Sequence, residues 1–284
     1  MSKANKKVFA IPRPIIYTGK LLQVISPKLA TNLALKLFQT PYKFKAPDRE
    51  KTMFQRAHKE KLYIPVLDKR IQVYHCDQRP EKVLIVHGWA GRGTQLHSIA
   101  KICVDHDIQA ISFDAPAHGY SEGKVSNMTE FISCIHEIDR QYGPFTYAIG
   151  HSLGGMALMN AVKEGFNIKK LVVIGSGNSI TTICNNFVKR LELKPKIGGL
   201  LKDRLDELLG SDSENLSTYR VAENVKIPVL IVHDTQDTEV DIKEAHHIDT
   251  VLDQSELFIT TGLGHHKTLW KPEVLNKIIH FLKS

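Results

Sequence analysis

Two segments of the chain have the pattern Gly-x-Ser-x-Gly, which can hold a serine hydroxyl on a sharp turn. One is centred on Ser152 and the other on Ser121. The segment around Ser152 lies directly between an apolar run, residues 145–149, and a stretch with helical spacing. A serine on such a strand-to-helix turn is exposed as a nucleophile, and the start of the helix favours developing negative charge. We therefore expect Ser152 to be the nucleophile.

The second serine lacks this context. Ser121 follows a loop that contains Pro116, and no helical pattern begins directly behind it. A plain helix cap would explain a serine at position 152, but it would not explain the glycines two residues to either side. The two matches therefore differ in what surrounds them, although their pattern is the same.

A serine hydroxyl needs a base to become a nucleophile, and the base needs a carboxylate that fixes its tautomer. Both types of residue follow later apolar runs. Asp234 and Asp237 come after one run, and His265 and His266 come after the next. In parallel sheets, the residues that follow successive strands meet at one edge, so these side chains are expected near Ser152.

Together these segments resemble the α/β-hydrolase superfamily of serine hydrolases, over residues 62–284. The order Ser, Asp, His along the chain is that of this superfamily. The resemblance implies an α/β fold with a mainly parallel central sheet flanked by helices. It is carried by His87–Gly91, Asp114–Ser121, the turn at Ser152, and the loops that contain Asp237 and His265.

The resemblance also selects within each pair of candidates. The acid of the family stands a few residues beyond its strand, which implies Asp237 in preference to Asp234. The base of the family follows a glycine, which implies His265, after Gly264, in preference to His266. His266 would then line the pocket.

Two backbone groups are implied as the oxyanion hole. They are the N–H of Trp89, which follows a His-Gly pair, and the N–H of Leu153, which follows the nucleophile. Ser121 falls in a segment that resembles the loop after the family's fourth strand, so its role is expected to be structural. This loop has Ala117 where the family usually has glycine.

The expected function is that of a serine hydrolase that acts on esters of small or medium-sized carboxylic acids through an acyl-enzyme. Serine at position 152 argues against the dehalogenase and epoxide hydrolase branches, whose nucleophile is aspartate. Amide, thioester or carbon–carbon bond hydrolysis would use the same residues, and a non-catalytic ligand-binding or scaffold protein is the alternative from another class. No cofactor is expected, and without His-Glu-x-x-His or Cys-His spacing no metal site is expected either.

The strands and helices that must position these residues can be predicted from short apolar runs in the sequence. The runs alternate with stretches of helical spacing, which predicts a mainly parallel sheet covered on both faces. Residues 62–67 and 70–76 predict two strands joined in a hairpin through Asp68 and Lys69. The other runs are residues 83–86, 110–113, 145–149, 171–174, 229–232 and 257–260.

The interval between residues 174 and 229 is too long for a simple crossover. It contains a helical pattern with Leu201, Leu205 and Leu208 that ends at Gly210. We therefore expect a small helical cap, inserted at about residues 177–225, that limits the size of the acyl group.

Residues 1–61 are expected to form a basic helical extension. They hold 14 basic and 3 acidic side chains, a net charge of +11, whereas the whole chain of 284 residues carries +8. Residues 26–39 predict a helix with Leu29, Leu33 and Leu37 on one face. We expect this face to pack against the hydrolase domain, with peripheral contact to an anionic membrane as the alternative. The small-molecule ester is the expected partner, and nucleic acid is not.

The four cysteines lie far apart and form no Cys-x-x-Cys pair, which favours a reducing compartment. Pro12, Arg13 and Pro14 interrupt the apolar stretch that a cleaved leader would require. No run approaches the ~20 apolar residues that span a bilayer. A cytoplasmic location is therefore expected.

Overall fold

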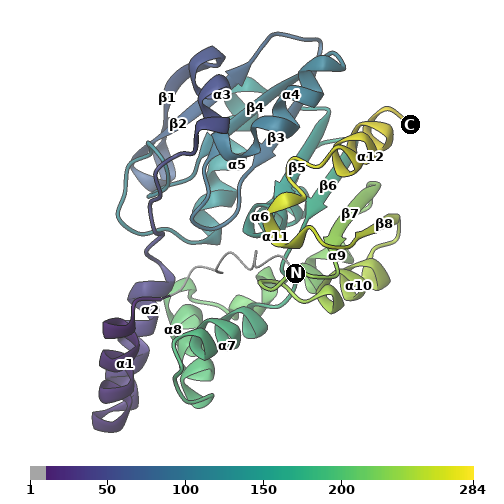
Figure 1. Ribbon diagram of the computed structural model, residues 1–284. Coiled ribbons are helices and arrows are strands. Elements are labelled where there is room, and N and C mark those ends of the chain that lie inside the picture. The colour runs from purple at the N-terminus through teal and green to yellow at the C-terminus, as the bar shows by residue number, and fades with distance from the viewer. Residues whose placement is uncertain (1–10) are drawn as a thin grey trace, which may run out of the picture. The chain divides into compact units, whose positions relative to one another are not determined.

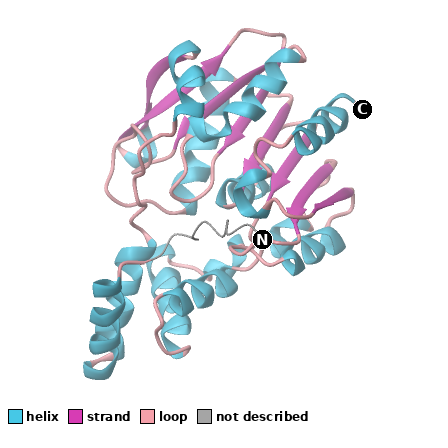
Figure 2. Ribbon diagram, in the orientation of Figure 1, coloured by secondary structure: helices cyan, strands magenta, loops and turns pink. Residues whose placement is uncertain are grey.

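The structure of the protein is a computed structural model that describes residues 11–284. The chain divides into two compact units. The sheet unit comprises residues 40–178 and 216–284, and the helical unit comprises the residues up to 39 together with 179–215. All strands of the described residues belong to the sheet unit (Figure 2).

Eight strands form one sheet in the order β1-β2-β4-β3-β5-β6-β7-β8. The β1–β2 and β2–β4 pairs are antiparallel, and the five other pairs are parallel. This confirms the mainly parallel sheet that the apolar runs predict. The strands are β1 His58–Ile64, β2 Lys69–Cys76, β3 Glu81–Val86, β4 Ile108–Asp114, β5 Tyr147–His151, β6 Lys170–Ile174, β7 Val229–Asp234 and β8 Ser255–Thr260.

Helices cover both faces of the sheet (Figure 1). On one face, α4 and α12 contribute to a hydrophobic cluster that includes Val83 and Ile85 of β3. Leu84 is buried as well but points to the opposite face, because successive strand residues alternate. The helices of the sheet unit are α3 Lys51–Arg56, α4 His97–Asp105, α5 Met128–Tyr142, α6 Leu153–Lys163, α9 Thr218–Ala222, α10 Ile242–Val251, α11 Gly264–Lys267 and α12 Pro272–Lys283. Short 3-10 helices are η1 Asp48–Glu50, η2 Pro65–Leu67, η3 Gly93–Leu96 and η4 Ser213–Leu216.

The predicted hairpin is present, but its first strand is shifted. β1 ends at Ile64, and the next three residues form η2 rather than a strand. Pro65 has no N–H for the ladder, so it ends the strand. The turn is completed by Asp68, which has a φ of 49°.

The helical unit consists of α1 Arg13–Ile25, α2 Pro27–Phe38, α7 Ile180–Arg190 and α8 Lys196–Leu209. Within it α1 packs on α2, α2 on α8 and α7 on α8. The predicted helices at 26–39 and around Leu201 are confirmed, and α8 ends at Gly210 in the left-handed region, with a φ of 66°. The predicted leucine face of α2 is wrong in part: its buried residues are Ala30, Thr31 and Ala34, whereas Leu29 is 45% exposed.

The unit boundary lies at residue 39, whereas the sequence places the end of the extension at residue 61. The difference arises because η1 and α3 belong to the sheet unit, where Met53 joins the core cluster. A cap role for the insertion at 177–225 stays a prediction. Among residues 11–284, no helix has the length and apolar character that crossing a membrane requires.

Candidate active site

Ser152 lies on the sharp turn between β5, which ends at His151, and α6, which begins at Leu153. Its backbone has φ 52° and ψ −120°, a combination that is disfavoured for any residue with a Cβ atom. Its side chain makes no capping hydrogen bond to α6, so the serine is not there as a helix cap. Its N–H donates to the carbonyl of Ile174 at 2.9 Å, which ties the turn to the end of β6.

Glycine is required two residues before the serine because strand and helix pass so closely. A Cβ atom on Gly150 would lie 2.6 Å from the backbone of Gly154. A Cβ atom on Gly154 would in turn lie 2.4 Å from the carbonyl oxygen of Val86. The glycines therefore hold the serine in place through close backbone packing, as the pattern predicts.

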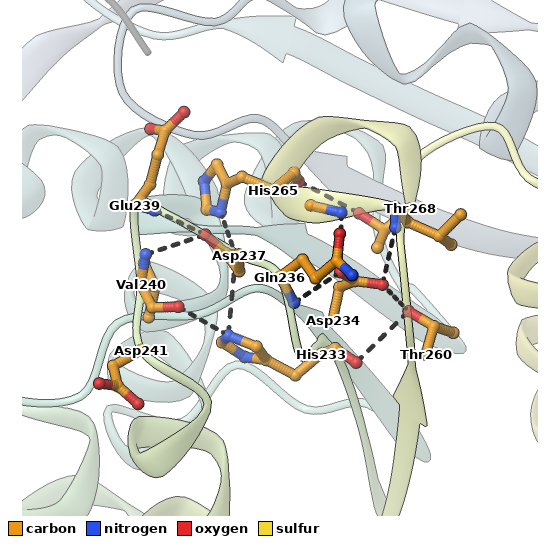
Figure 3. A network of polar contacts seen from close by, with 12 residues as sticks. His233, Asp234, Gln236, Asp237, Glu239, Val240, Asp241, Thr260, His265 and Thr268 are labelled. Atoms are coloured by element: carbon orange, nitrogen blue, oxygen red, sulfur yellow. Dashed lines mark hydrogen bonds and ion pairs between the residues drawn. The ribbon is translucent and has the colours of Figure 1, made fainter. Parts of the chain in front are cut away.

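His265 and Asp237 meet directly at the next strand ends. The Nδ1–H of His265 donates to Oδ2 of Asp237 at 2.6 Å, and both side chains are buried (Figure 3). Oδ1 of Asp237 accepts the N–H groups of Glu239 at 2.8 Å and Val240 at 3.0 Å. Burial alone would raise the pKa of Asp237, but the hydrogen bond from His265 and these two N–H groups lower it below its usual value. The carboxylate is therefore charged and can fix the imidazole tautomer.

The other candidate acid has a different use. The carboxylate of Asp234 accepts four hydrogen bonds, and none comes from His265. Burial would raise its pKa, but these hydrogen bonds lower it. Since two of the donors immediately precede His265, Asp234 holds the loop that carries the base. The donors are the N–H groups of Gln236, Leu263 and Gly264 and the hydroxyl of Thr260.

His266 points to a different carboxylate. Its Nε2 forms an ion pair with Glu239 at 3.1 Å, and its side chain is 52% exposed. The side chain of His265 is only 5% exposed. The two neighbouring histidines therefore diverge, and His265 is the one that contacts Asp237.

The serine turn and the histidine loop adjoin through His151. Its Nε2–H donates to the carbonyl of His265 at 3.1 Å, and the two rings lie 4.6 Å apart. Burial, together with the neighbouring imidazoles of His265 and His266, holds the pKa of His151 well below its usual range, so the ring is neutral. No hydrogen bond within residues 11–284 joins Ser152 to His265; such contacts often tighten only when substrate binds. Sequence reasoning missed His151, although its place beside the nucleophile was a signal.

The two backbone N–H groups expected as an oxyanion hole flank the serine. Leu153 is the first residue of α6, where a helix N–H has no acceptor within the helix. Trp89 lies in a turn closed by the hydrogen bond from Gly91 N–H to the Gly88 carbonyl at 3.0 Å. A Cβ atom on Gly88 would lie 2.8 Å from that of Ser152, so this turn lies against Ser152.

Two buried histidines fasten the Trp89 turn to the loop after β4. The Nδ1–H of His118 donates to the carbonyl of Pro116 at 2.8 Å, and its Nε2 accepts the N–H of Ala90 at 3.1 Å. The Nε2 of His87 accepts the N–H of Ala115 at 3.0 Å. Burial lowers the pKa of His118 to about 4 and that of His87 well below its usual range. Both rings are therefore neutral positioning groups, which the sequence analysis did not foresee.

Ser121 is not part of this site. Its hydroxyl donates to the carbonyl of Asp114 and accepts the N–H of Gln72 at 2.8 Å. The side chain is thus fully used in fixing the loop, as the resemblance implies. Ala117 in the same loop has a φ of 64°, which explains why glycine is usual there.

Within the described part of the chain, no group of three His, Cys, Asp or Glu side chains could hold a metal ion.

Comparisons with known proteins give the same fold. Residues 83–191 match the Alpha/beta hydrolase family. An esterase from Pyrococcus furiosus superposes with a TM-score of 0.67 at 16% identity, over 86% of this chain and 98% of that one. A bromoperoxidase from Bacillus anthracis gives 0.61 at 16% identity, over 80% and 99% of the two chains. A serine hydrolase involved in carbazole degradation superposes with a TM-score of 0.61 at 15% identity, over 80% of this chain and 99% of that one.

None of the curated proteins compared with the chain matches it. The structural relatives are too distant in sequence to transfer an activity, and their described activities differ from one another. The sheet order, the strained turn at Ser152 and the family match nevertheless agree. The chain has the α/β-hydrolase fold, and its residues 83–191 match the Alpha/beta hydrolase family.

Proposed function

We propose that the protein is a serine hydrolase that cleaves carboxylic esters of small or medium size. The observation that carries the proposal is the 2.6 Å hydrogen bond between His265 and the charged carboxylate of Asp237, beside a serine on a strained turn. With Nδ1 donating to Asp237, the other ring nitrogen of His265 is left as a base. Ser152, His265 and Asp237 would then act as a catalytic triad.

In the first half of the reaction, Ser152 Oγ attacks the ester carbonyl carbon and its proton passes to His265. The N–H groups of Trp89 and Leu153 stabilise the negative oxygen that forms. The intermediate then expels the alcohol, which takes the proton from His265. An acyl-enzyme on Ser152 remains.

In the second half, His265 removes a proton from water, and the resulting hydroxide attacks the acyl carbon. The carboxylic acid leaves, and the proton on His265 returns to Ser152. Asp237 keeps its charge throughout and stabilises the imidazolium. This scheme uses no cofactor.

Ester hydrolysis is favoured over amide, thioester or carbon–carbon bond cleavage by the named esterase among the structural relatives. A non-catalytic ligand-binding or scaffold role is the second candidate, and the absence of a Ser152–His265 hydrogen bond among the described contacts is the observation in its favour. All four cysteines are free thiols, which supports a reducing, cytoplasmic setting.

A fluorophosphonate probe tests the proposal directly, because it reacts with activated serines. Labelling of the wild-type protein should disappear in Ser152→Ala and His265→Ala but persist in His266→Ala, the matched neighbour. A panel of p-nitrophenyl esters of increasing acyl length would then define the substrate class. A folded wild-type protein that takes no label and cleaves no ester would instead support the binding role.

A further inference from the structure

The outer face of α1 is apolar and open to solvent. Tyr17, Leu21, Val24 and Ile25 are 60%, 62%, 78% and 65% exposed. They stand at i, i+4, i+7 and i+8, a spacing that places them on one side of a helix. Such a concentration of large apolar side chains on one exposed helix face is typical of a binding surface.

The opposite side of α1 is packed within the helical unit. Ile16 and Gly19 are buried, and a Cβ atom on Gly19 would lie 3.1 Å from the side chain of Leu193. The Gln23 side chain accepts the N–H of Lys194 at 2.9 Å. The helix is therefore held by its inner side, and the apolar outer face is presented on a fixed support.

The chain segment that carries this face has charge of one sign. The chain has nine lysines and arginines before its first acidic residue, Asp48. Arg13 and Lys20 lie along one edge of the apolar face, and Lys28 follows at the start of α2. Lys20 is paired with Glu192, whereas Arg13 and Lys28 are exposed.

We propose that this face of α1 binds the surface of an anionic lipid bilayer. The four apolar side chains would enter the interface between headgroups and acyl chains, and the basic residues would lie at the headgroups. A second copy of the chain is the weaker choice, because it would bring two strongly basic segments together. Nucleic acid would match the charge but leave the apolar side chains unused.

The surface differs from the one that the sequence indicates. From the sequence, the leucine face of α2 is expected to pack against the protein, with membrane contact as the alternative. In the structure α2 packs on α8, and its exposed apolar residue is Leu29. The proposal also stands apart from catalysis, since α1 contributes no group to the reaction. Ser152→Ala should therefore bind vesicles as well as the wild-type protein does.

Co-sedimentation of the full-length protein with vesicles tests the proposal. Vesicles of phosphatidylcholine with about 30% phosphatidylserine should bind it, and pure phosphatidylcholine vesicles should bind it far less. Raising the salt from about 0.05 to 0.5 M should weaken binding, because screening acts on the charges.

Leu21→Asp combined with Val24→Asp should weaken binding by about 30-fold or more, since apolar area is lost and two like charges enter the interface. The matched control carries Val66→Asp and Leu208→Asp, two exposed apolar sites elsewhere that change the net charge equally. Its binding should fall by less than about threefold. Thermal unfolding checks that both variants are folded.

Leu21→Trp gives a second measurement that preserves the apolar face. Its fluorescence should shift to shorter wavelength with anionic vesicles, whereas that of Leu208→Trp should not. Equal loss of binding in the two double variants, or no binding of the wild-type protein to anionic vesicles, would overturn the proposal. So would a dimer in solution that the α1 variant abolishes without any change in vesicle binding.

Discussion

The two Gly-x-Ser-x-Gly turns have the same pattern and opposite uses of the serine. Ser121 does not have a positive φ, and its hydroxyl makes two hydrogen bonds inside the protein. At Ser152 the backbone is strained, with a φ of 52°, and the hydroxyl has no capping bond. The first serine stabilises a loop, and the second is the proposed nucleophile. The motif alone therefore does not distinguish the two serines. The hydrogen bonds that each hydroxyl makes or lacks do.

The flanking glycines differ in the same way. Around Ser152, Gly150 makes room for the backbone of the following helix. Around Ser121, Gly119 makes room for the carboxylate of Asp114, since a Cβ atom there would lie 2.1 Å from Oδ2. That carboxylate accepts the N–H groups of Gly93 and Tyr120 at 2.8 Å, so this loop is built around a buried acid. One turn therefore positions the proposed nucleophile, whereas the other supports the neighbouring turn that carries Trp89.

The largest difference between the two serines should appear in turnover. Ser152→Ala should lower kcat by about 10⁶, the magnitude that loss of the catalytic serine has in subtilisin, while Ser121→Ala should retain most of the activity. Steady-state kinetics on a p-nitrophenyl ester measures both. An active Ser152→Ala enzyme beside an inactive, folded Ser121→Ala enzyme would reverse the assignment.

The two aspartates extend the comparison. Asp237→Asn should lower kcat by about 10⁴, because the amide favours the wrong tautomer of His265. Asp234→Asn should mainly lower stability, since an amide cannot accept all four hydrogen bonds. Parallel measurements of kcat and Tm separate the two effects. Similar kcat losses in both variants, at equal Tm, would contradict the division of roles.

The pH dependence of stability tests the support role of the loop after β4. The pKa of His118 falls from 6.5 to about 4 on folding, so the unfolded chain takes up a proton first as the pH drops. The stability that the neutral His118 ring provides is therefore fully present above pH 6.5 and is lost as the pH falls toward 4. The free energy of unfolding should fall by at most about 3 kcal/mol over this range.

Urea unfolding at several pH values within this window would reveal the slope. His118→Gln should flatten it without abolishing it, because His87 and His151 are also buried with lowered pKa values. His266→Gln, at an exposed site, serves as the control. An unchanged slope in His118→Gln would show that this ring does not stabilise the fold as a neutral group.

The smallest expected effect is on stability at neutral pH. Ser121→Ala should lower the free energy of unfolding by about 2 kcal/mol, because it leaves the buried N–H of Gln72 without its acceptor. Ser152→Ala should cost almost nothing, since no capping bond is lost. Denaturant titration of both variants provides the measurement, and a larger loss in Ser152→Ala would mean that its hydroxyl is structural after all.

The sheet could be predicted from the sequence because strands β3 to β7 are largely buried on both faces and contain continuous apolar runs. The sequence places the edge strand β1 too late, since its first residues, including His58 and Lys59, are exposed and polar. Helix α1 is not predicted at all. Pro14 interrupts the apolar pattern there, but it lies in the first helical turn, where its missing N–H costs nothing.

The candidate site is predictable where a motif fixes the backbone, as at Ser152. The choice between Asp234 and Asp237 rests on resemblance, because Asp234 is the last residue of β7 and Asp237 follows only three residues later. The two carboxylates differ in the N–H groups whose hydrogen bonds they accept, and only Asp237 accepts one from an imidazole, that of His265. Such contacts depend on the fold of two loops together, and the same holds for the link from His151 to His265.

The strained turn at Ser152 has a consequence for how this chain could evolve. A serine at a φ of 52° makes folding less favourable than glycine would, by on the order of 1 kcal/mol. If only the fold were under selection, glycine would be favoured at this position. Selection for catalytic activity would instead retain the serine. Ser152→Gly should therefore be more stable than the wild-type protein and, on the proposed mechanism, inactive.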